Sequence, residues 1–248
     1  MAFSFSDWKK RISKRNDITG MLTHLTKPKE IYDKNIKESD INKCAIDNLI
    51  SILVDKKING SSTKSGFIIG DIPAVCFQDA PLHGIIQNVE NEIENRIQNR
   101  CNKIRYCGNG FLFSKFYVYG KGGRPVIYDM TSDAKQYLPP DQYWRIVNLQ
   151  LSVEPSIIID WTHEREWRVP NNFEFEYDLT HVVVYDKETY DYFKEKCNIE
   201  ILNKLHGITI LKSFNVDYIK LQGSLNFRSR LSVSSLWFLQ LQQLLEVN

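Results

Sequence analysis

The sequence predicts an α+β fold, and three observations lead to that prediction. Short apolar runs of strand length alternate with segments whose apolar residues recur at helical spacing. Glycine-rich turns and closely spaced strands favour hairpins alongside crossovers, which argues against a doubly wound parallel sheet. Hydrophobic residues make up 42% of the 248 positions, enough for a sizeable core. We therefore expect a single domain over residues 1–248.

The first half of the chain is predicted to begin with a short basic helix at residues 6–17. Ser6 is the expected cap of this helix, and Trp8 and Ile12 give it an apolar stripe. The elements predicted after it are strands at 19–26 and 72–77, helices at 41–57 and 82–100, and strands at 110–119 and 124–128. Because Gly120-Lys121-Gly122-Gly123 separates the last two strands, they are expected to form a hairpin.

The second half is predicted to begin with a helix at 140–153, because proline suits a first helical turn and Pro140 stands there. The elements predicted after it are strands at 156–161, 164–169, 173–177 and 181–185, a helix at 187–196, a strand at 208–212 and an apolar helix at 231–245. Residues 171–248 are expected to complete the sheet and to pack a terminal helix.

Composition excludes several classes of function. The net charge of +2 gives no overall attraction to nucleic acid or to an anionic membrane. No apolar run is long enough to span a bilayer, and the first residues lack a signal-peptide pattern, so we expect a cytoplasmic protein with no membrane partner. The five cysteines include no Cys-x-x-Cys pair, which predicts reduced thiols and no metal site.

The most distinctive chemical segment is the predicted strand at 164–169. Side chains alternate along a strand, so Glu164, Glu166 and Arg168 are expected to project to one side, with the two carboxylates about 7 Å apart. Like charges at that spacing raise the pKa of at least one carboxyl unless a cation such as Arg168 compensates. The alternative interpretation is a solvated face of an edge strand whose glutamates pair with its own arginines.

The segment from Glu164 to Pro170, with sequence Glu-Arg-Glu-Trp-Arg-Val-Pro, resembles the Glu-x-Glu signature of mono-ADP-ribosyltransferases. The resemblance implies that Glu166 holds a ribose hydroxyl of NAD and stabilises the cationic transition state as nicotinamide leaves. It implies that Glu164 orients the acceptor or acts as its general base. NAD would be consumed as a substrate, and no metal would be required.

A second segment, Thr23-His24-Leu25-Thr26 followed by a helix with Asn48-Leu49, is similar to the opening of DNA ADP-ribosyltransferase toxins. The resemblance implies that His24 binds the nicotinamide-side ribose, with Thr26 beside it. For the tyrosine that stacks on nicotinamide in other branches, Tyr106, Tyr119 and Tyr128 are all candidates, and Tyr128 is our choice. The alternative for His24 is a half-buried strand histidine bonded to backbone.

Over residues 18–170 the chain resembles an AbiGi-like abortive-infection family. The shared features are the His-x-Thr start, the Val75-Cys76-Phe77 strand, a hairpin over 113–128 and the Glu-x-Glu-Trp-Arg strand. The resemblance implies an ADP-ribosyltransferase-like split, mostly antiparallel sheet with flanking helices. It implies a bacterial phage-defence or toxin–antitoxin setting, with an antitoxin or toxin as a further partner.

Three hypotheses of function follow. The first is an NAD-dependent mono-ADP-ribosyltransferase, or an NAD-consuming relative, whose acceptor is a protein or a nucleic acid. The second is a non-catalytic binding module of the same fold, an antitoxin or sensor in which Glu164 and Glu166 pair with a protein partner. The third and weakest is a metal-dependent nuclease, which would need Asp79 or Asp129 to converge on the glutamates. Separately, Gly122-Gly123-Arg124 could offer backbone N–H groups to a phosphate.

Overall fold

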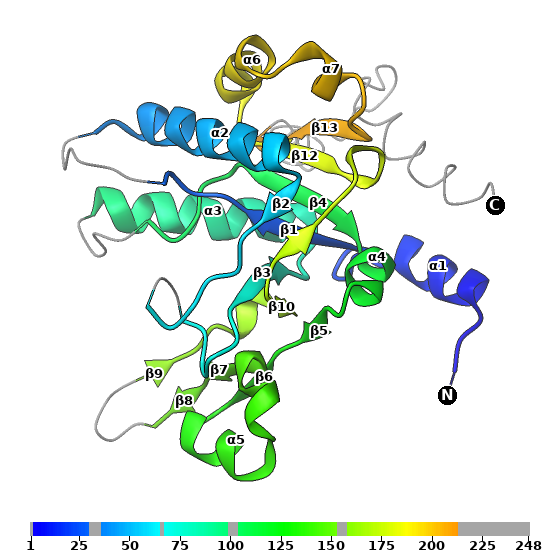
Figure 1. Cartoon of the computed structure of the whole chain (residues 1–248), viewed down its shortest axis with the longest axis vertical. Helices are drawn as coiled ribbons and strands as arrows, with labels where there is room; N and C mark the ends of the chain where they lie inside the picture. The colour runs from blue at the N-terminus through cyan, green and yellow to red at the C-terminus, as the bar shows by residue number, and fades with distance from the viewer. Residues whose placement is uncertain (1, 30–35, 65–66, 99–103, 153–157, 213–248) are drawn as a thin grey trace, which may run out of the picture.

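The computed structural model describes the chain except for residue 1 and residues 30–35, 65–66, 99–103, 153–157 and 213–248. Its strands form a mostly antiparallel seven-stranded sheet in the order β13-β12-β4-β1-β3-β10-β5 (Figure 1). These strands are β1 (Met21–Leu25), β3 (Ala74–Gln78), β4 (Gly110–Ser114), β5 (Arg124–Pro125), β10 (Glu166–Pro170), β12 (His181–Val184) and β13 (Gly207–Ile210). Only β12 and β13 run parallel within this sheet, and the α+β prediction is confirmed.

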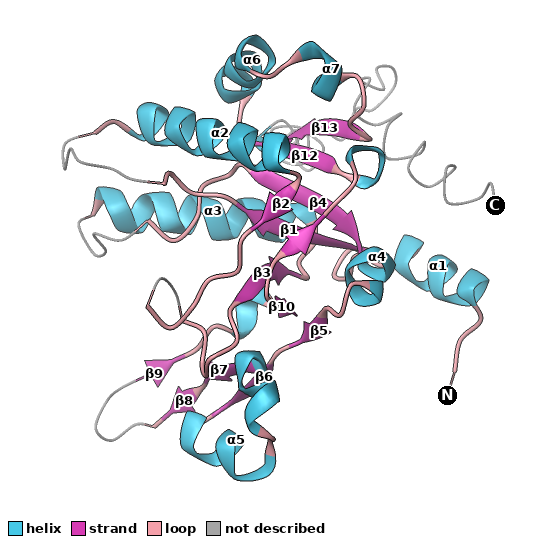
Figure 2. Cartoon of the chain, viewed as in Figure 1, coloured by secondary structure: helices cyan, strands magenta, loops and turns pink. Residues whose placement is uncertain are grey.

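Helices flank the sheet on both sides (Figure 2). The helices of the described chain are α1 (Phe5–Ser13), α2 (Glu38–Asp55), α3 (Leu82–Ile97), α4 (Lys115–Gly120), α5 (Thr131–Tyr137), α6 (Lys187–Lys196) and α7 (Ile199–Leu202), of which α5 lies apart from the main sheet. The 3-10 turns are η1 (Pro140–Arg145), η2 (Thr162–Glu164) and η3 (Tyr177–Leu179). Short two-stranded pairs lie outside the main sheet: β2 (Lys57–Ile58) with β11 (Phe173–Glu174), β6 (Ile127–Asp129) with β7 (Ile146–Asn148), and β8 (Gln150–Leu151) with β9 (Ile158–Ile159).

The alternation of side chains along the strands divides the core into two layers. On β4, Phe111 and Phe113 pack beneath α2 and α6, whereas Leu112 packs with α3 on the other face. The larger layer includes Leu49 of α2 and Phe193 of α6, both fully buried. Because both faces of β4 are covered, this strand is an almost continuous apolar run, as buried strands are.

The joint between β1 and β3 has the fewest registered residue pairs in the sheet. These strands share one register pair, Thr23 with Gln78, whereas β1 and β4 share five and β3 and β10 share five. At this joint the His24 ring supplies a further link, because its Nδ1 lies 2.8 Å from the Cys76 carbonyl oxygen. The sheet thus consists of two well-paired parts that meet along a short contact.

Several predicted elements are confirmed, with boundaries shifted by a few residues. The helix at 187–196 has the predicted bounds, and Asp186 caps it by accepting the Thr189 N–H at 2.9 Å. The first helix begins one residue before Ser6. Its cap is Ser4, whose hydroxyl accepts the Asp7 N–H at 3.1 Å. Strands β12 and β13 join the main sheet, as expected of the chain after residue 171, while the predicted helix at 231–245 lies outside the described residues.

The predicted hairpin over 110–128 is wrong. Strand β4 ends at Ser114, helix α4 follows, and β5 pairs with β10 instead of returning along β4. Both edges of β4 are already occupied by β1 and β12, so no edge remains for a hairpin partner. The glycines close the end of α4: Gly122 has a φ of 90°, and a Cβ on Gly123 would lie 2.6 Å from a Val118 methyl carbon.

The predicted helix at 140–153 is wrong as well. Pro140 does begin a helical turn, but η1 ends at Arg145, and Ile146 and Val147 then form a strand parallel to β6. Isoleucine and valine favour strands, and the β6 partner decides between the two structures. The preceding helix α5 was not predicted. Together with β6–β9 it forms the small group of elements at the lower end of Figure 1.

Within the described residues, no helix has both the length and the apolar character needed to cross a membrane. The described cysteines Cys44, Cys76, Cys107 and Cys197 are all free thiols, as the sequence predicts.

The packing of α2 against the sheet predicts how substitutions on this helix change the free energy of unfolding. Replacing Leu49, which is fully buried in α2, by alanine should lower the free energy of unfolding by about 2–5 kcal/mol, because a cavity forms under the sheet. Val54 on the same helix is 63% exposed, so Val54→Ala should change it by less than about 0.5 kcal/mol. Urea denaturation of both variants checks this, and equal losses would contradict the described packing of α2.

Candidate functional site

The candidate site begins in a tight turn that precedes β10. The Asp160 carboxylate accepts the Thr162 N–H at 2.9 Å and the Thr162 hydroxyl at 2.6 Å, which starts the 3-10 turn η2. Glu164 ends η2, and Arg165 follows with a φ of 47° in the left-handed region. The prediction that Glu164 lies on the strand is therefore wrong, because β10 begins only at Glu166.

The left-handed residue is fixed by its neighbours. The Arg165 guanidinium donates to the backbone oxygen of Asp17, and its own carbonyl accepts the Asp79 N–H at 3.2 Å. The turn is thus anchored to the segment before β1 and to the end of β3. Glu164 is half-buried at this turn, whereas Glu166, the first residue of β10, is only 7% exposed.

Glu166 forms a two-point ion pair with Arg168 on the same face of β10, as the strand alternation predicts. The Arg168 Nε and Nη2 lie 2.8 and 3.2 Å from the two carboxylate oxygens of Glu166. Nη1 donates to the backbone oxygens of Trp144 at 2.7 Å and Ile146 at 3.0 Å. A buried ion pair is tolerated only when its remaining donors are also satisfied, and here the guanidinium is bonded on all three nitrogens.

Within the described part of the chain no cation forms an ion pair with Glu164, and its pKa is raised to about 7. Burial is the first cause and the negative charge of Glu166 the second, with a further contribution from Glu92. A hydrogen bond with Tyr106 and the charge of Arg105 act in the opposite direction. The rise in pKa predicted for one of the two carboxyls therefore occurs at Glu164, because the positive charge of Arg168 balances the negative charge of Glu166.

A series of polar side chains leads from α3 to Glu164. Asn88 donates through Nδ2 to the Gln78 Oε1 at 3.0 Å, so the Gln78 amide nitrogen is left to donate. Tyr106 interacts with both Gln78 and Glu164: the interaction with Gln78 lowers the pKa of Tyr106, and the interaction with Tyr106 lowers the pKa of Glu164. An interaction that lowers the pKa of a carboxyl favours its charged form, so Tyr106 opposes part of the rise in the Glu164 pKa.

Tyr128, our choice for the nicotinamide region, does lie beside Glu166. Its hydroxyl oxygen accepts the Glu166 N–H at 2.7 Å. Burial raises the pKa of Tyr128 to about 12, so the phenol keeps its proton at neutral pH. The hydroxyl can therefore still donate one hydrogen bond next to the two glutamates.

His24 lies on the opposite face of the sheet from Glu166. Thr23 is paired with Gln78, and Gln78 with Glu166, so these three side chains share one face. His24, the next residue, instead packs its ring against Phe77. Burial lowers the pKa of His24, and the carbonyl at Nδ1 can only accept, so the ring is neutral with its proton on Nδ1. The structure supports the backbone-bonded alternative for this histidine.

Thr26 is also separate from the glutamates. It is 3% exposed, and its hydroxyl donates to the Asn109 backbone oxygen at 2.9 Å. Of the residues chosen from sequence, the structure thus brings together Glu164, Glu166 and Tyr128, and it does not bring His24 or Thr26 to them.

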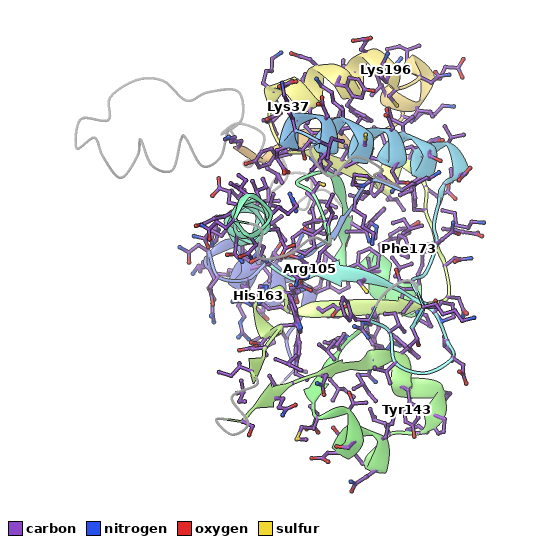
Figure 3. All side chains as sticks on the ribbon, turned by 90° about the vertical axis from the view of Figure 1, so that its left-hand side faces the viewer. Lys37, Arg105, Tyr143, His163, Phe173 and Lys196 are labelled. Atoms are coloured by element: carbon purple, nitrogen blue, oxygen red, sulfur yellow. The ribbon has the colours of Figure 1, made fainter. Side chains whose placement is uncertain are left out.

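The cluster includes residues that sequence reasoning did not assign to it. Gln78 ends the Val-Cys-Phe strand, and Tyr106 was considered only for nicotinamide stacking. Glu92 of α3 is 3% exposed and forms an ion pair with Arg105 at 2.6 Å. The Arg105 guanidinium lies 4.6 Å from the Trp161 ring centre, which brings it beside the turn that carries His163 and Glu164 (Figure 3).

The surroundings limit the chemistry available to the site. Among the described residues, no group of three histidines, cysteines or carboxylates could hold a metal ion, so nothing there supports the nuclease hypothesis. Burial and the charge of Glu166 raise the pKa of Cys76 well above its usual value, which makes its thiol a poor nucleophile. What remains is a carboxylate pair in which one member is salt-bridged and the other can exchange a proton near neutral pH.

Comparison of the chain with protein-family models, with curated proteins and with solved structures finds no match. Function must therefore be argued from the site itself.

The raised pKa of Glu164 predicts a specific dependence of stability on pH. Because its pKa is about 7 in the folded chain and about 4.5 when unfolded, the folded state holds this proton more tightly. The resulting stability is present at low pH and is lost as the pH rises through 7. Between pH 5 and pH 8, the wild-type protein should lose roughly 2 kcal/mol more unfolding free energy than Glu164→Gln.

Urea denaturation at the two pH values measures this difference. Glu174→Gln is the matched control, because Glu174 is exposed on β11 and should leave the wild-type dependence unchanged. A Glu164→Gln variant with the same pH dependence as the wild type would contradict the raised pKa.

The buried ion pair gives a second stability test. Arg168→Met removes the cation and leaves the Glu166 carboxylate uncompensated, which should cost about 3–5 kcal/mol of unfolding free energy. Adding Glu166→Gln to this variant removes the stranded charge and should restore part of the loss. If the double variant is no more stable than Arg168→Met in urea denaturation, the two residues do not depend on each other as described.

Proposed function

We propose that this protein consumes NAD as a mono-ADP-ribosyltransferase, or as a close mechanistic relative, in the cytoplasm of a bacterium as part of a phage-defence or toxin–antitoxin system. The observation that carries the proposal is the pair of unequal carboxylates at the start of β10. The loosely joined β1 and β3 within a mostly antiparallel sheet are compatible with an ADP-ribosyltransferase-type fold.

In the proposed reaction, the bond between C1′ of the ribose and the nicotinamide nitrogen breaks. Nicotinamide leaves with the bonding electrons, and positive charge develops on the ribose. Glu166 stabilises this charge through its carboxylate, which Arg168 and the strand hold in place. Since the carboxylate is fixed before the substrate arrives, no reorganisation is needed during the reaction.

Glu164 is proposed as the general base. It takes the proton from the acceptor as the acceptor forms its new bond to C1′, so the products are the ADP-ribosylated acceptor, nicotinamide and a proton. A general base works best when its pKa lies near the working pH, and the pKa of Glu164 is about 7. Tyr106 interacts with the Glu164 carboxyl, and Tyr128 has a hydroxyl hydrogen to donate to the substrate.

His24 is given no part in this reaction, because it lies on the other face of the sheet. The acceptor is a protein or a nucleic acid, and an antitoxin or toxin partner remains part of the proposal.

A second candidate is a non-catalytic binding module, an antitoxin or sensor. The observation that favours it is the ion pair between Arg168 and Glu166, which uses both carboxylate oxygens of Glu166. A substrate would have to bind the remaining lone pairs of that carboxylate. In this candidate the half-buried Glu164 meets a cation of a protein partner.

The test is incubation of the purified protein with NAD, with lysate protein and nucleic acid added as acceptors, while free nicotinamide is followed by mass-resolved chromatography. Wild-type protein should release nicotinamide, and Glu166→Gln should release it roughly 100-fold more slowly or not at all. Glu174→Gln, the exposed control on β11, should match the wild type.

Thermal melting shows whether Glu166→Gln is folded at the assay temperature, since its Arg168 loses a partner. Nicotinamide release at the wild-type rate by the folded Glu166→Gln variant would contradict the assigned role. Wild-type protein that binds NAD unchanged, or ignores it, would favour the binding module.

A further inference from the structure

Two arginines meet at the outer edge of the sheet. Arg124 lies on β5, which among the described strands is the edge next to β10. Arg145 ends η1, and its Nε and Nη2 both donate to the Pro125 backbone oxygen at 3.2 Å. The second guanidinium is thereby tied to the residue that directly follows Arg124.

Arg124 is held as firmly as Arg145. Its Nη1 donates to the backbone oxygens of Tyr119 at 3.1 Å and Gly123 at 2.7 Å. The centre of its guanidinium lies 4.1 Å from the centre of the Tyr119 ring. Backbone carbonyls therefore orient both side chains, and the Tyr119 ring also positions Arg124, before any ligand is present.

Neither guanidinium has a carboxylate partner within the described part of the chain. The buried or half-buried arginines Arg96, Arg105 and Arg168, by contrast, each form an ion pair with a glutamate. Burial and the neighbouring charge of Arg124 lower the pKa of Arg145, as expected when two cations stand together without compensation. An anion between them would remove this repulsion.

The free donors fit one kind of anion in particular. Arg124 retains Nε and Nη2, and Arg145 retains Nη1, after their contacts with described residues are counted. Guanidinium N–H groups in a fixed fork match the oxygens of a phosphate. The backbone N–H groups expected to serve this purpose do not, because Gly122 and Gly123 donate theirs to carbonyls of α4.

We propose that Arg124 and Arg145 form a binding site for the phosphate group of a nucleotide or polynucleotide. The site adjoins the carboxylates: Arg124 is paired with Arg168 across β5 and β10, and the Val126 N–H donates to the Glu166 backbone oxygen at 3.0 Å. The phosphate site deepens the proposed function, because NAD carries a pyrophosphate that the two arginines would bind. Only the identification of the ligand as NAD rests on the proposed function.

Isothermal titration calorimetry tests the site with three probes: inorganic pyrophosphate, ADP and a single-stranded oligonucleotide. Wild-type protein should bind at least one of them. Arg124→Gln and Arg145→Gln should each weaken that binding about tenfold or more, since each removes a charge-assisted contact. Arg124→Lys should bind more weakly than the wild type, because it keeps the charge and loses the fork.

Arg11→Gln is the matched control, because Arg11 lies on α1 and stacks on Phe3. It should bind the probes as the wild type does. Binding of pyrophosphate and ADP identifies a nucleotide phosphate, whereas binding of the oligonucleotide alone identifies a polynucleotide phosphate. Circular dichroism melting establishes that each variant is folded before it is titrated.

The proposal is overturned if the wild type binds none of the probes, or if binding survives in both folded glutamine variants. Nicotinamide release is a separate measurement on the same samples. A protein that binds pyrophosphate through these arginines and releases no nicotinamide would retain the phosphate site and lose the proposed NAD chemistry.

Discussion

The ion pair between Glu166 and Arg168 is the contact on which the arrangement of the site depends. It is buried from solvent, and the guanidinium also holds the carbonyls of Trp144 and Ile146. Strand β10 is thereby connected to η1 and β7, which are far from it in sequence. A buried ion pair adds little to the free energy of unfolding, yet removal of either partner lowers that free energy by several kcal/mol, about 3–5. The contact therefore determines how β10, η1 and β7 are arranged, and contributes less to overall stability.

The pair also creates the inequality between the two glutamates. Arg168 is committed to Glu166 and to backbone, so Glu164 is left among negative charges with only partial exposure to water. Its pKa rises for that reason, and the interaction with Tyr106 offsets only part of the rise. Two carboxylates with different proton affinities a short distance apart are a recurring arrangement for dividing acid–base and electrostatic roles. The proposed NAD chemistry uses this division, with Glu166 near the developing cation and Glu164 near the acceptor.

Much of the fold could be predicted from local signals, and the exceptions have physical causes. The helix at 187–196 is predicted correctly from the residue pattern, and the Asp186 cap in the structure shows that it is determined locally. The helix predicted at 140–153 is wrong, because Ile146 and Val147 become strand only through pairing with β6. Strand alternation predicts that Glu166 and Arg168 lie on the same face of β10. The positive φ of Arg165, which moves Glu164 off the strand, cannot be predicted from the residue pattern. The face of His24 depends on the register between β1 and β3, and the contribution of Tyr106 depends on α3 and β3. These contacts join segments that are distant in the sequence, so they cannot be predicted from local residue patterns.

The central claim is that Glu164 exchanges its proton near neutral pH because it lies half-buried beside a salt-bridged Glu166. Carbon-13 NMR of glutamate side-chain carboxyls, titrated from pH 4 to pH 9 and assigned with Glu164→Gln, measures this directly. The account predicts one carboxyl that titrates near pH 7, is absent from Glu164→Gln, and titrates at lower pH in Glu166→Gln, where the neighbouring charge is removed. A Glu164 carboxyl that titrates at the ordinary value of about 4.3 would contradict it.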